Sequence, residues 1–177
     1  MKKTVKIPEG FEIEINEKKV SLKHSNGELS RNFSDLRYDN FINIEKKDDE
    51  ITVSTSVDKR KYKAMTGTIA AHIQNMIKGL EKKFRYKVRI NYTHFPMTVE
   101  VKDGKIMIKN FLGSKGIRTS KIIGDVSIKV EKTDIFIEGN NKEDVSQTAA
   151  NIEMSTRLPK KDRRVFGDGC FIESKGE

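Results

Sequence analysis

An internal repeat constrains the fold of this 177-residue chain more than any other feature of its sequence. When the chain is slid along itself, the apolar positions of the second half fall in the same register as those of the first. The matched segments are residues 13–15 with 99–101, 42–46 with 128–132, 51–53 with 135–137, and 70–73 with 149–152. Charged matches carry little weight where 34% of residues are charged, but a shared apolar register does. The repeat predicts two related domains, residues 1–87 and 88–177.

The secondary-structure signals agree between the halves. Alternating apolar residues at 11–15 indicate a half-buried strand, and Asp103-Gly104 between two such runs is a strong hairpin signal. Each half then ends in a helical pattern. The apolar positions are Ile69, Ile73, Met76, Ile77, Leu80 and Phe84 in the first half, and Val145, Ala149 and Ile152 in the second. We expect the second helix to begin at 140–141 and to stop before Pro159. The prediction is an α+β fold of two tandem duplicated domains, each an antiparallel sheet with one main helix packed on a face.

Composition narrows the partner and the compartment. The net charge of +9 and the pI near 9.5 favour a polyanionic partner. A hydrophobic share of 35% predicts thin cores. The single Cys170 fits a reducing cytosol, and no apolar run suits a signal peptide or a membrane span. We expect a soluble cytoplasmic protein without a membrane partner.

Few residues suggest catalysis or a cofactor. The histidines, His24, His72 and His94, have no metal-ligand spacing, and Cys170 has no nearby partner cysteine. No glycine-rich phosphate loop opens a helix. We therefore predict no cofactor and no enzyme. One alternative is a small RNA-processing enzyme that uses His94 with Glu138 in a cleft between the domains.

Basic clusters are more informative than the total charge. Residues 102–121 contain one acid, Asp103, among their lysines and arginine, and residues 157–166 contain only Asp162. The second cluster follows Pro159 and leads into the glycines of 166–169, which would allow the backbone to approach a phosphate closely. Lysine and arginine supply phosphate contacts, which provide affinity with little sequence information. We favour RNA binding for these clusters and a solvated loop for the third, 59–63.

Several segments together resemble a known family. They are 66–77 (TGTIAAHIQNMI), 92–96 (YTHFP), 110–115 (NFLGSK), 138–140 (EGN), 145–150 (VSQTAA) and 162–169 (DRRVFGDG). In this order they resemble the large-subunit ribosomal protein called L-six in bacteria and L-nine in eukaryotes. The Gly-Lys-rich bacterial tail is absent, which places the chain with the archaeal type.

The resemblance implies two domains of one fold and no catalytic residues. It implies binding to large-subunit ribosomal RNA, mainly through the second domain, near the docking region of translational GTPases and the stalk base. Neighbouring ribosomal proteins would be further partners. Alternatives are a generic RNA-binding module or a protein adaptor of another ribonucleoprotein. The candidate RNA-binding residues are Lys105, Lys109, Asn110, Lys115, Arg118, Lys121, Gln147, Arg157, Lys160, Lys161, Arg163, Arg164 and Phe166.

Overall fold

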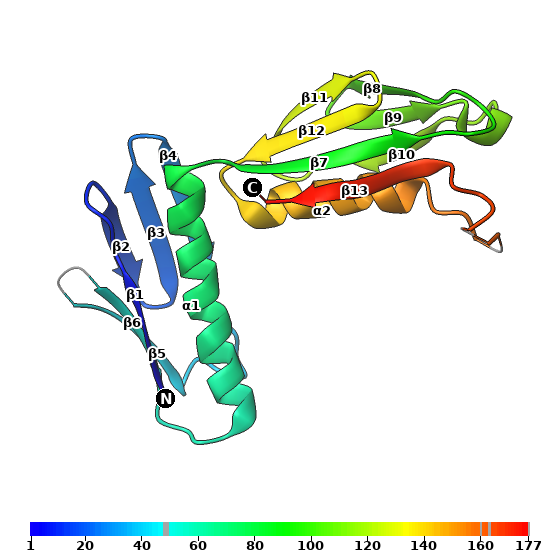
Figure 1. Cartoon of the computed structure of the whole chain (residues 1–177). Coiled ribbons are helices and arrows are strands. Elements are labelled where there is room, and N and C mark those ends of the chain that lie inside the picture. Colours follow the sequence, from blue (N-terminus) through cyan, green and yellow to red (C-terminus); the bar gives the residue numbers. More distant parts are fainter. Residues whose placement is uncertain (48–49, 160, 163, 177) are drawn as a thin grey trace. The chain divides into compact units, whose positions relative to one another are not determined.

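The chain forms two compact units, Met1–Lys82 and Lys83–Glu177, in a computed structural model (Figure 1). The structure describes residues 1–47, 50–159, 161–162 and 164–176. The units divide just before strand β7 (Phe84–Asn91), whereas the repeat placed the division between 87 and 88. Because β7 is one continuous strand, the whole of it belongs to the second unit.

Unit 1 contains two three-stranded antiparallel sheets and one long helix. Its elements are β1 (Lys2–Lys6), β2 (Glu12–Asn16), β3 (Lys19–His24), β4 (Gly27–Asn32), β5 (Ile42–Lys47), β6 (Glu50–Thr55) and α1 (Arg60–Glu81). The strand orders are β1-β6-β5 and β2-β3-β4. Helix α1 packs against strands of both sheets, so one core lies between the helix and the sheets.

The apolar spacing of α1 explains this packing. Ile69, Ile73 and Ile77 lie on one face of the helix and are almost completely buried against Ile51 and Val53 of β6. The sequence pattern was wrong at its last position: Phe84 begins β7. Helix α1 ends at Glu81, and the backbone at Lys82 is already extended, so the helical period stops before Phe84.

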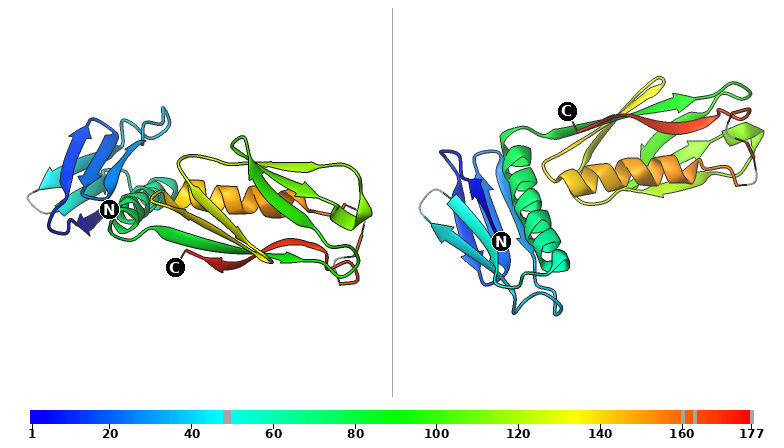
Figure 2. Two further views of the ribbon diagram at one scale, coloured as in Figure 1. Left: turned by 90° about the horizontal axis from the view of Figure 1, so that it is seen from above. Right: turned by 60° about the horizontal axis from the view of Figure 1, so that its bottom comes forward.

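Unit 2 repeats this plan with one strand more. Its elements are β7, β8 (Thr98–Lys102), β9 (Lys105–Lys109), the short 3-10 helix η1 (Phe111–Gly113), β10 (Arg118–Lys121), β11 (Ser127–Glu131), β12 (Asp134–Gly139), α2 (Lys142–Ser155) and β13 (Gly169–Lys175). The strand orders are β10-β9-β8 and β11-β12-β7-β13. In both views of Figure 2, β13 (red) follows β7 (green) along one edge of its sheet.

Local signals predicted the turns and caps of unit 2 well. Asp103 and Gly104 have φ of 52° and 66°, so they form the tight turn that joins β8 and β9. Asn141 caps α2 by accepting a 3.1 Å hydrogen bond from the backbone N–H of Glu143. The helix ends at Ser155, before Pro159. The α+β class with tandem duplicated domains is thus confirmed, with two sheets around each helix.

Candidate nucleic-acid interface

Three lysines form a row across the sheet β10-β9-β8. Lys105 of β9 lies directly opposite Lys102 of β8 and opposite Lys121 of β10. Adjacent strands lie about 4.8 Å apart, and all three side chains are exposed. Among the residues that the structure describes, none of these lysines is in ion-pair contact with a carboxylate. Directly opposed like charges destabilise a sheet, so this lysine row favours a partner that supplies negative charge.

The corresponding row of unit 1 is different. The segment 13–15 matches 99–101 in the repeat, which aligns β2 and β3 with β8 and β9. In unit 1, Lys19 lies opposite Asn16 of β2 and Asn32 of β4. The same register therefore presents one lysine between two asparagines in unit 1. The row of three lysines is found in unit 2 and not at the matching place in unit 1.

Other predicted residues of the 105–121 cluster are engaged within the protein. Lys109 pairs with Glu100 at 2.6 Å, and Asn110 donates from Nδ2 to the Pro96 carbonyl at 2.9 Å. Arg118 donates to the Ser155 carbonyl at 2.7 Å, and its guanidinium lies 4.3 Å from the Phe111 ring centroid. Arg118 and Asn110 thus hold the fold together.

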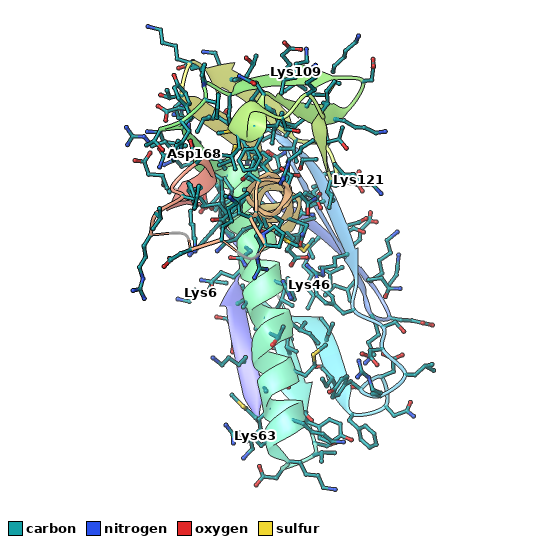
Figure 3. The ribbon with its side chains drawn as sticks, turned by 90° about the vertical axis from the view of Figure 1, so that its right-hand side faces the viewer. Lys6, Lys46, Lys63, Lys109, Lys121 and Asp168 are labelled. Carbon is teal, nitrogen blue, oxygen red and sulfur yellow. The ribbon has the colours of Figure 1, made fainter. Side chains whose placement is uncertain are left out.

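Two lysines of this cluster, Lys115 and Lys109, lie outside the lysine row. Lys115 is exposed in the loop before β10, where it is available to a partner. Lys109, labelled in Figure 3, lies well apart from Lys121 of the lysine row. The structure therefore divides the predicted cluster into an open row and a set of internal contacts.

The predicted residues of α2 and the tail are partly exposed. Gln147 donates to the Asn151 side chain at 3.0 Å on the exposed face of α2. Arg157 and Arg164 are exposed, whereas the ammonium of Lys161 lies 4.3 Å from the Phe166 ring centroid. Lys160 and Arg163 lie outside the described residues.

A buried carboxylate anchors the tail, and the sequence analysis missed it. Asp168 is 3% exposed and accepts four hydrogen bonds from the segment after β7. The donors are the backbone N–H of Thr93 at 2.7 Å and of His94 at 3.1 Å, the Thr93 hydroxyl at 3.0 Å, and His94 Nδ1 at 2.6 Å. The His94 ring also stacks on Phe166, with ring centroids 5.7 Å apart. Asp168 therefore fixes the basic tail to the end of β7.

The ionisation of Asp168 follows from these contacts. Burial by itself would raise the pKa of this carboxyl, but the hydrogen bonds from Thr93 and His94 hold the pKa well below its usual range. The charge is therefore present at neutral pH and fully hydrogen-bonded. The one sequence signal was an acid between the two glycines of a basic segment, and nothing local identified its partner.

His94 and Glu138, the candidate catalytic pair of an RNA-processing enzyme, each have a different partner. His94 contacts Asp168, and Glu138 pairs with Arg85 at 3.2 Å. Cys170 is buried in the unit 2 core, and burial raises the pKa of its thiol to about 12, so it is a poor nucleophile.

Within the described residues, no group of histidine, cysteine and carboxylate side chains is arranged to hold a metal ion. No helix there is long and apolar enough to cross a membrane.

Comparison with known proteins tests the resemblance directly. The family model described as ribosomal protein L6 matches residues 7–83 and 95–169, one stretch in each unit. The chain belongs to the ribosomal protein L6 family. That membership makes it a structural, non-enzymatic protein of the large ribosomal subunit, working in the ribosomes of the cytoplasm.

Individual relatives cover almost the whole chain. The large ribosomal subunit protein uL6 of Staphylothermus marinus is 49% identical, covering 98% of this chain and 94% of the relative. The uL6 proteins of Desulfurococcus amylolyticus and Methanothrix thermoacetophila are 47% and 44% identical, covering 98% and 96% of this chain and 94% of each relative. The similarity to archaeal members of the L6 family confirms the branch expected from the tail.

Proposed function

We propose that this L6-family protein binds large-subunit ribosomal RNA mainly through unit 2, with the lysine row of Lys102, Lys105 and Lys121 as its central phosphate contact. The observation that carries the proposal is the register that places these three positive charges side by side, none of them in an ion pair with a described carboxylate. A phosphate backbone neutralises such a row and releases counterions, which favours binding.

Further contacts extend the surface beyond the lysine row. Lys115 adds an exposed charge near β10, and the tail adds Arg157, Lys161 and Arg164. Phe166 positions Lys161 through their cation–π contact. Gln147 offers an amide on the exposed face of α2. Lys109 contacts a phosphate by giving up its ion pair with Glu100. Lys160 and Arg163 remain candidates by sequence.

The test copies the unit 1 row into unit 2. The double variant Lys102→Asn with Lys121→Asn leaves Lys105 between two asparagines, as Lys19 is in unit 1. We expect affinity for purified large-subunit RNA to fall about tenfold to a hundredfold at low salt. The slope of log affinity against log salt should become shallower by about 2, because two phosphate contacts are lost.

The control removes the same charge from unit 1. Lys46→Gln with Lys61→Gln lowers the net charge equally, but these residues lie outside the proposed surface. This control should bind RNA like the unchanged protein. Equal losses in the two double variants would mean that total charge decides binding, and an unaffected Lys102/Lys121 variant would overturn the assignment of the lysine row.

We also propose, from the family resemblance, that unit 2 lies near the docking region of translational GTPases and the stalk base, beside other ribosomal proteins. Because Cys170 is buried, a cysteine introduced by Lys115→Cys would be the accessible thiol for a tethered hydroxyl-radical source. In reconstituted large subunits, cleavage of ribosomal RNA should concentrate at the GTPase docking region. Cleavage confined to distant RNA would contradict this location.

A further inference from the structure

The edge of β7 in unit 2 is covered by the last strand of the chain. β13 pairs antiparallel with β7, placing Ile172 opposite Val88 and Phe171 opposite Arg89. It also packs against α2, where the backbone N–H of Cys170 donates to Thr156 Oγ1 at 2.9 Å. Figure 1 shows β13 (red) running alongside β7 at the edge of the sheet, with α2 beside it. Unit 2 thus covers the edge of β7, next to α2, with its own tail.

Strand β1 of unit 1 occupies the place that β7 has in unit 2. The orders β1-β6-β5 and β7-β12-β11 correspond, because Ile51 of β6 matches Ile135 of β12. Ile51 lies opposite Val5 and Ile135 lies opposite Val88, so Val5 corresponds to Val88. By the same register Thr4 corresponds to Lys87 and Lys6 to Arg89. Within the described residues, no strand pairs with β1 on the side that β13 occupies in unit 2.

The main chain of β1 is available for pairing on this side. Met1 and Thr55 exchange backbone hydrogen bonds at 3.1 and 3.0 Å. Because antiparallel pairs alternate, Lys3 and Val5 also bond to β6, whereas the N–H and C=O groups of Lys2, Thr4 and Lys6 point to the open edge. The same alternation turns Lys87 and Arg89 toward β13 in unit 2. The edge of β1 is therefore a template for a further strand.

A groove runs beside this edge. Thr4, Val5, Lys6 and Pro8 line one side of the groove, and Gln74, Ile77, Lys78 and Glu81 of α1 line the other. Continuing the match of 70–73 with 149–152, Gln74 corresponds to Glu153 and Ile77 to Thr156. Thr156 is the residue that bonds β13 in unit 2. Ile77, 4% exposed, replaces that polar contact with an apolar one.

The charges beside the edge of β1 indicate which side chains a further strand at this edge would carry. In unit 2, Glu173 of β13 pairs with Lys87 at 2.7 Å and with Arg89 at 3.1 Å. Lys6, the counterpart of Arg89, forms no ion pair with any described carboxylate, although Glu50 lies across from it on β6. On the α1 side of the groove, Lys78 adds a second positive charge and Glu81 a negative one, so Lys6 is the charge on the β1 side that an acidic residue of an added strand would meet.

We propose that the edge of β1 binds an extended segment of a partner protein as a fourth strand. This segment has an acidic residue facing Lys6 and an apolar residue facing Ile77. Main-chain hydrogen bonds to Lys2, Thr4 and Lys6 supply the affinity, and the two side-chain contacts supply the selectivity. The site goes beyond the proposed RNA binding, since it lies on unit 1 and takes a polypeptide.

The test uses a photo-crosslinking residue, Gln74→p-benzoylphenylalanine, in the full chain assembled into purified large subunits. Irradiation should link this residue to a polypeptide, giving a product that resists nuclease and is lost on proteolysis. Mass spectrometry should locate the linked site in an extended segment that carries a carboxylate.

Thr4→Pro tests strand addition itself. This change removes an N–H that β6 does not use and places a ring at the open edge, so the cross-link yield should fall at least about tenfold. The matched control is Lys46→Pro on β5, at the opposite edge of the same sheet, which should leave the yield unchanged (Figure 3). Incorporation into subunits and RNA affinity are measured for both variants, so a failure of RNA binding is recognised separately.

Four results would overturn the proposal. They are a cross-link to RNA, a cross-link to a second copy of this chain, no cross-link, and a polypeptide cross-link that Thr4→Pro leaves unchanged. Amide exchange provides an independent check. The β1 amides of Thr4 and Lys6 should exchange at least about tenfold more slowly in the subunit than in the free protein, and unchanged exchange would also overturn it.

Discussion

Units 1 and 2 share one plan but complete their sheets differently. In unit 2 the tail returns as β13 and pairs with β7, whereas in unit 1 no strand of the described residues pairs with the edge of β1 beside the groove. The rows across the smaller sheets differ as well, with Asn16, Lys19 and Asn32 in unit 1 and three lysines in unit 2. Two copies of a fold can therefore keep their core pattern while edges and surfaces take separate roles.

The largest expected effect comes from removing the strand that distinguishes the units. Deleting residues 168–177 removes Asp168 and the buried Cys170 and exposes the edge of β7. We expect unit 2 to lose its cooperative unfolding transition, a loss of more than about 5 kcal/mol. Unit 1 has its own core and should keep its transition. Heteronuclear NMR would show this, and a folded unit 2 in the deletion variant would contradict it.

A matched pair of prolines compares the two edges directly. Lys87→Pro removes an N–H that faces β13 and should cost about 3 kcal/mol or more, whereas Thr4→Pro should cost less than about 1 kcal/mol. Urea unfolding measures both. Lys87→Ala serves as the control, because it removes the ion pairs to Glu173 and Asp134 but keeps the main-chain hydrogen bond. Equal costs for the two prolines would mean that β13 adds little to unit 2.

The anchor of the tail predicts a smaller loss. Asp168→Asn keeps the size of the side chain but weakens four hydrogen bonds that are now accepted by a charged group. We expect the free energy of unfolding to fall by about 2 kcal/mol. Asp58→Asn, which removes an exposed ion pair with Lys63 in unit 1, is the control and should cost much less than Asp168→Asn, because exposed ion pairs contribute little to stability. A loss below about 0.5 kcal/mol would show that Asp168 does not anchor the tail.

The same carboxylate predicts a pH dependence. The pKa of Asp168 is lower in the folded protein than the value of about 3.9 in an unfolded chain. Its contribution is therefore complete above about pH 4 and declines as the pH falls toward the folded pKa. The difference in unfolding free energy between the unchanged protein and Asp168→Asn should shrink from pH 6 to pH 3. A difference that is constant over this range would contradict this reading.

The smallest effect concerns the lysine row in the free protein. Lys102→Asn with Lys121→Asn relieves like-charge repulsion, so thermal unfolding should shift slightly upward at low salt. The shift should vanish near 1 M salt, where the Debye length is about 3 Å. Asn16→Lys with Asn32→Lys, which builds the same row in unit 1, should shift unfolding in the opposite direction. Scanning calorimetry measures both, and no salt-dependent shift in either variant would show that the rows are not strained.

The sequence determined what depends on neighbouring residues. The apolar register revealed the duplication, Asp103-Gly104 predicted the β8–β9 turn, and Asn141 predicted the start of α2, because turns and caps are decided by a few adjacent side chains. The ribosomal family followed from ordered motifs, and the positive charge followed from composition.

Only the tertiary structure decided which residues meet. Lys102, Lys105 and Lys121 become neighbours through strand pairing, and Asp168 finds Thr93 only when the tail returns to β7. Contacts of this kind join residues far apart in the chain, and their register is set by which faces of each strand are buried. For the same reason the sequence could place a basic cluster at 102–121 but could not separate the open lysine row from Arg118, whose hydrogen bond to the Ser155 carbonyl holds the end of α2.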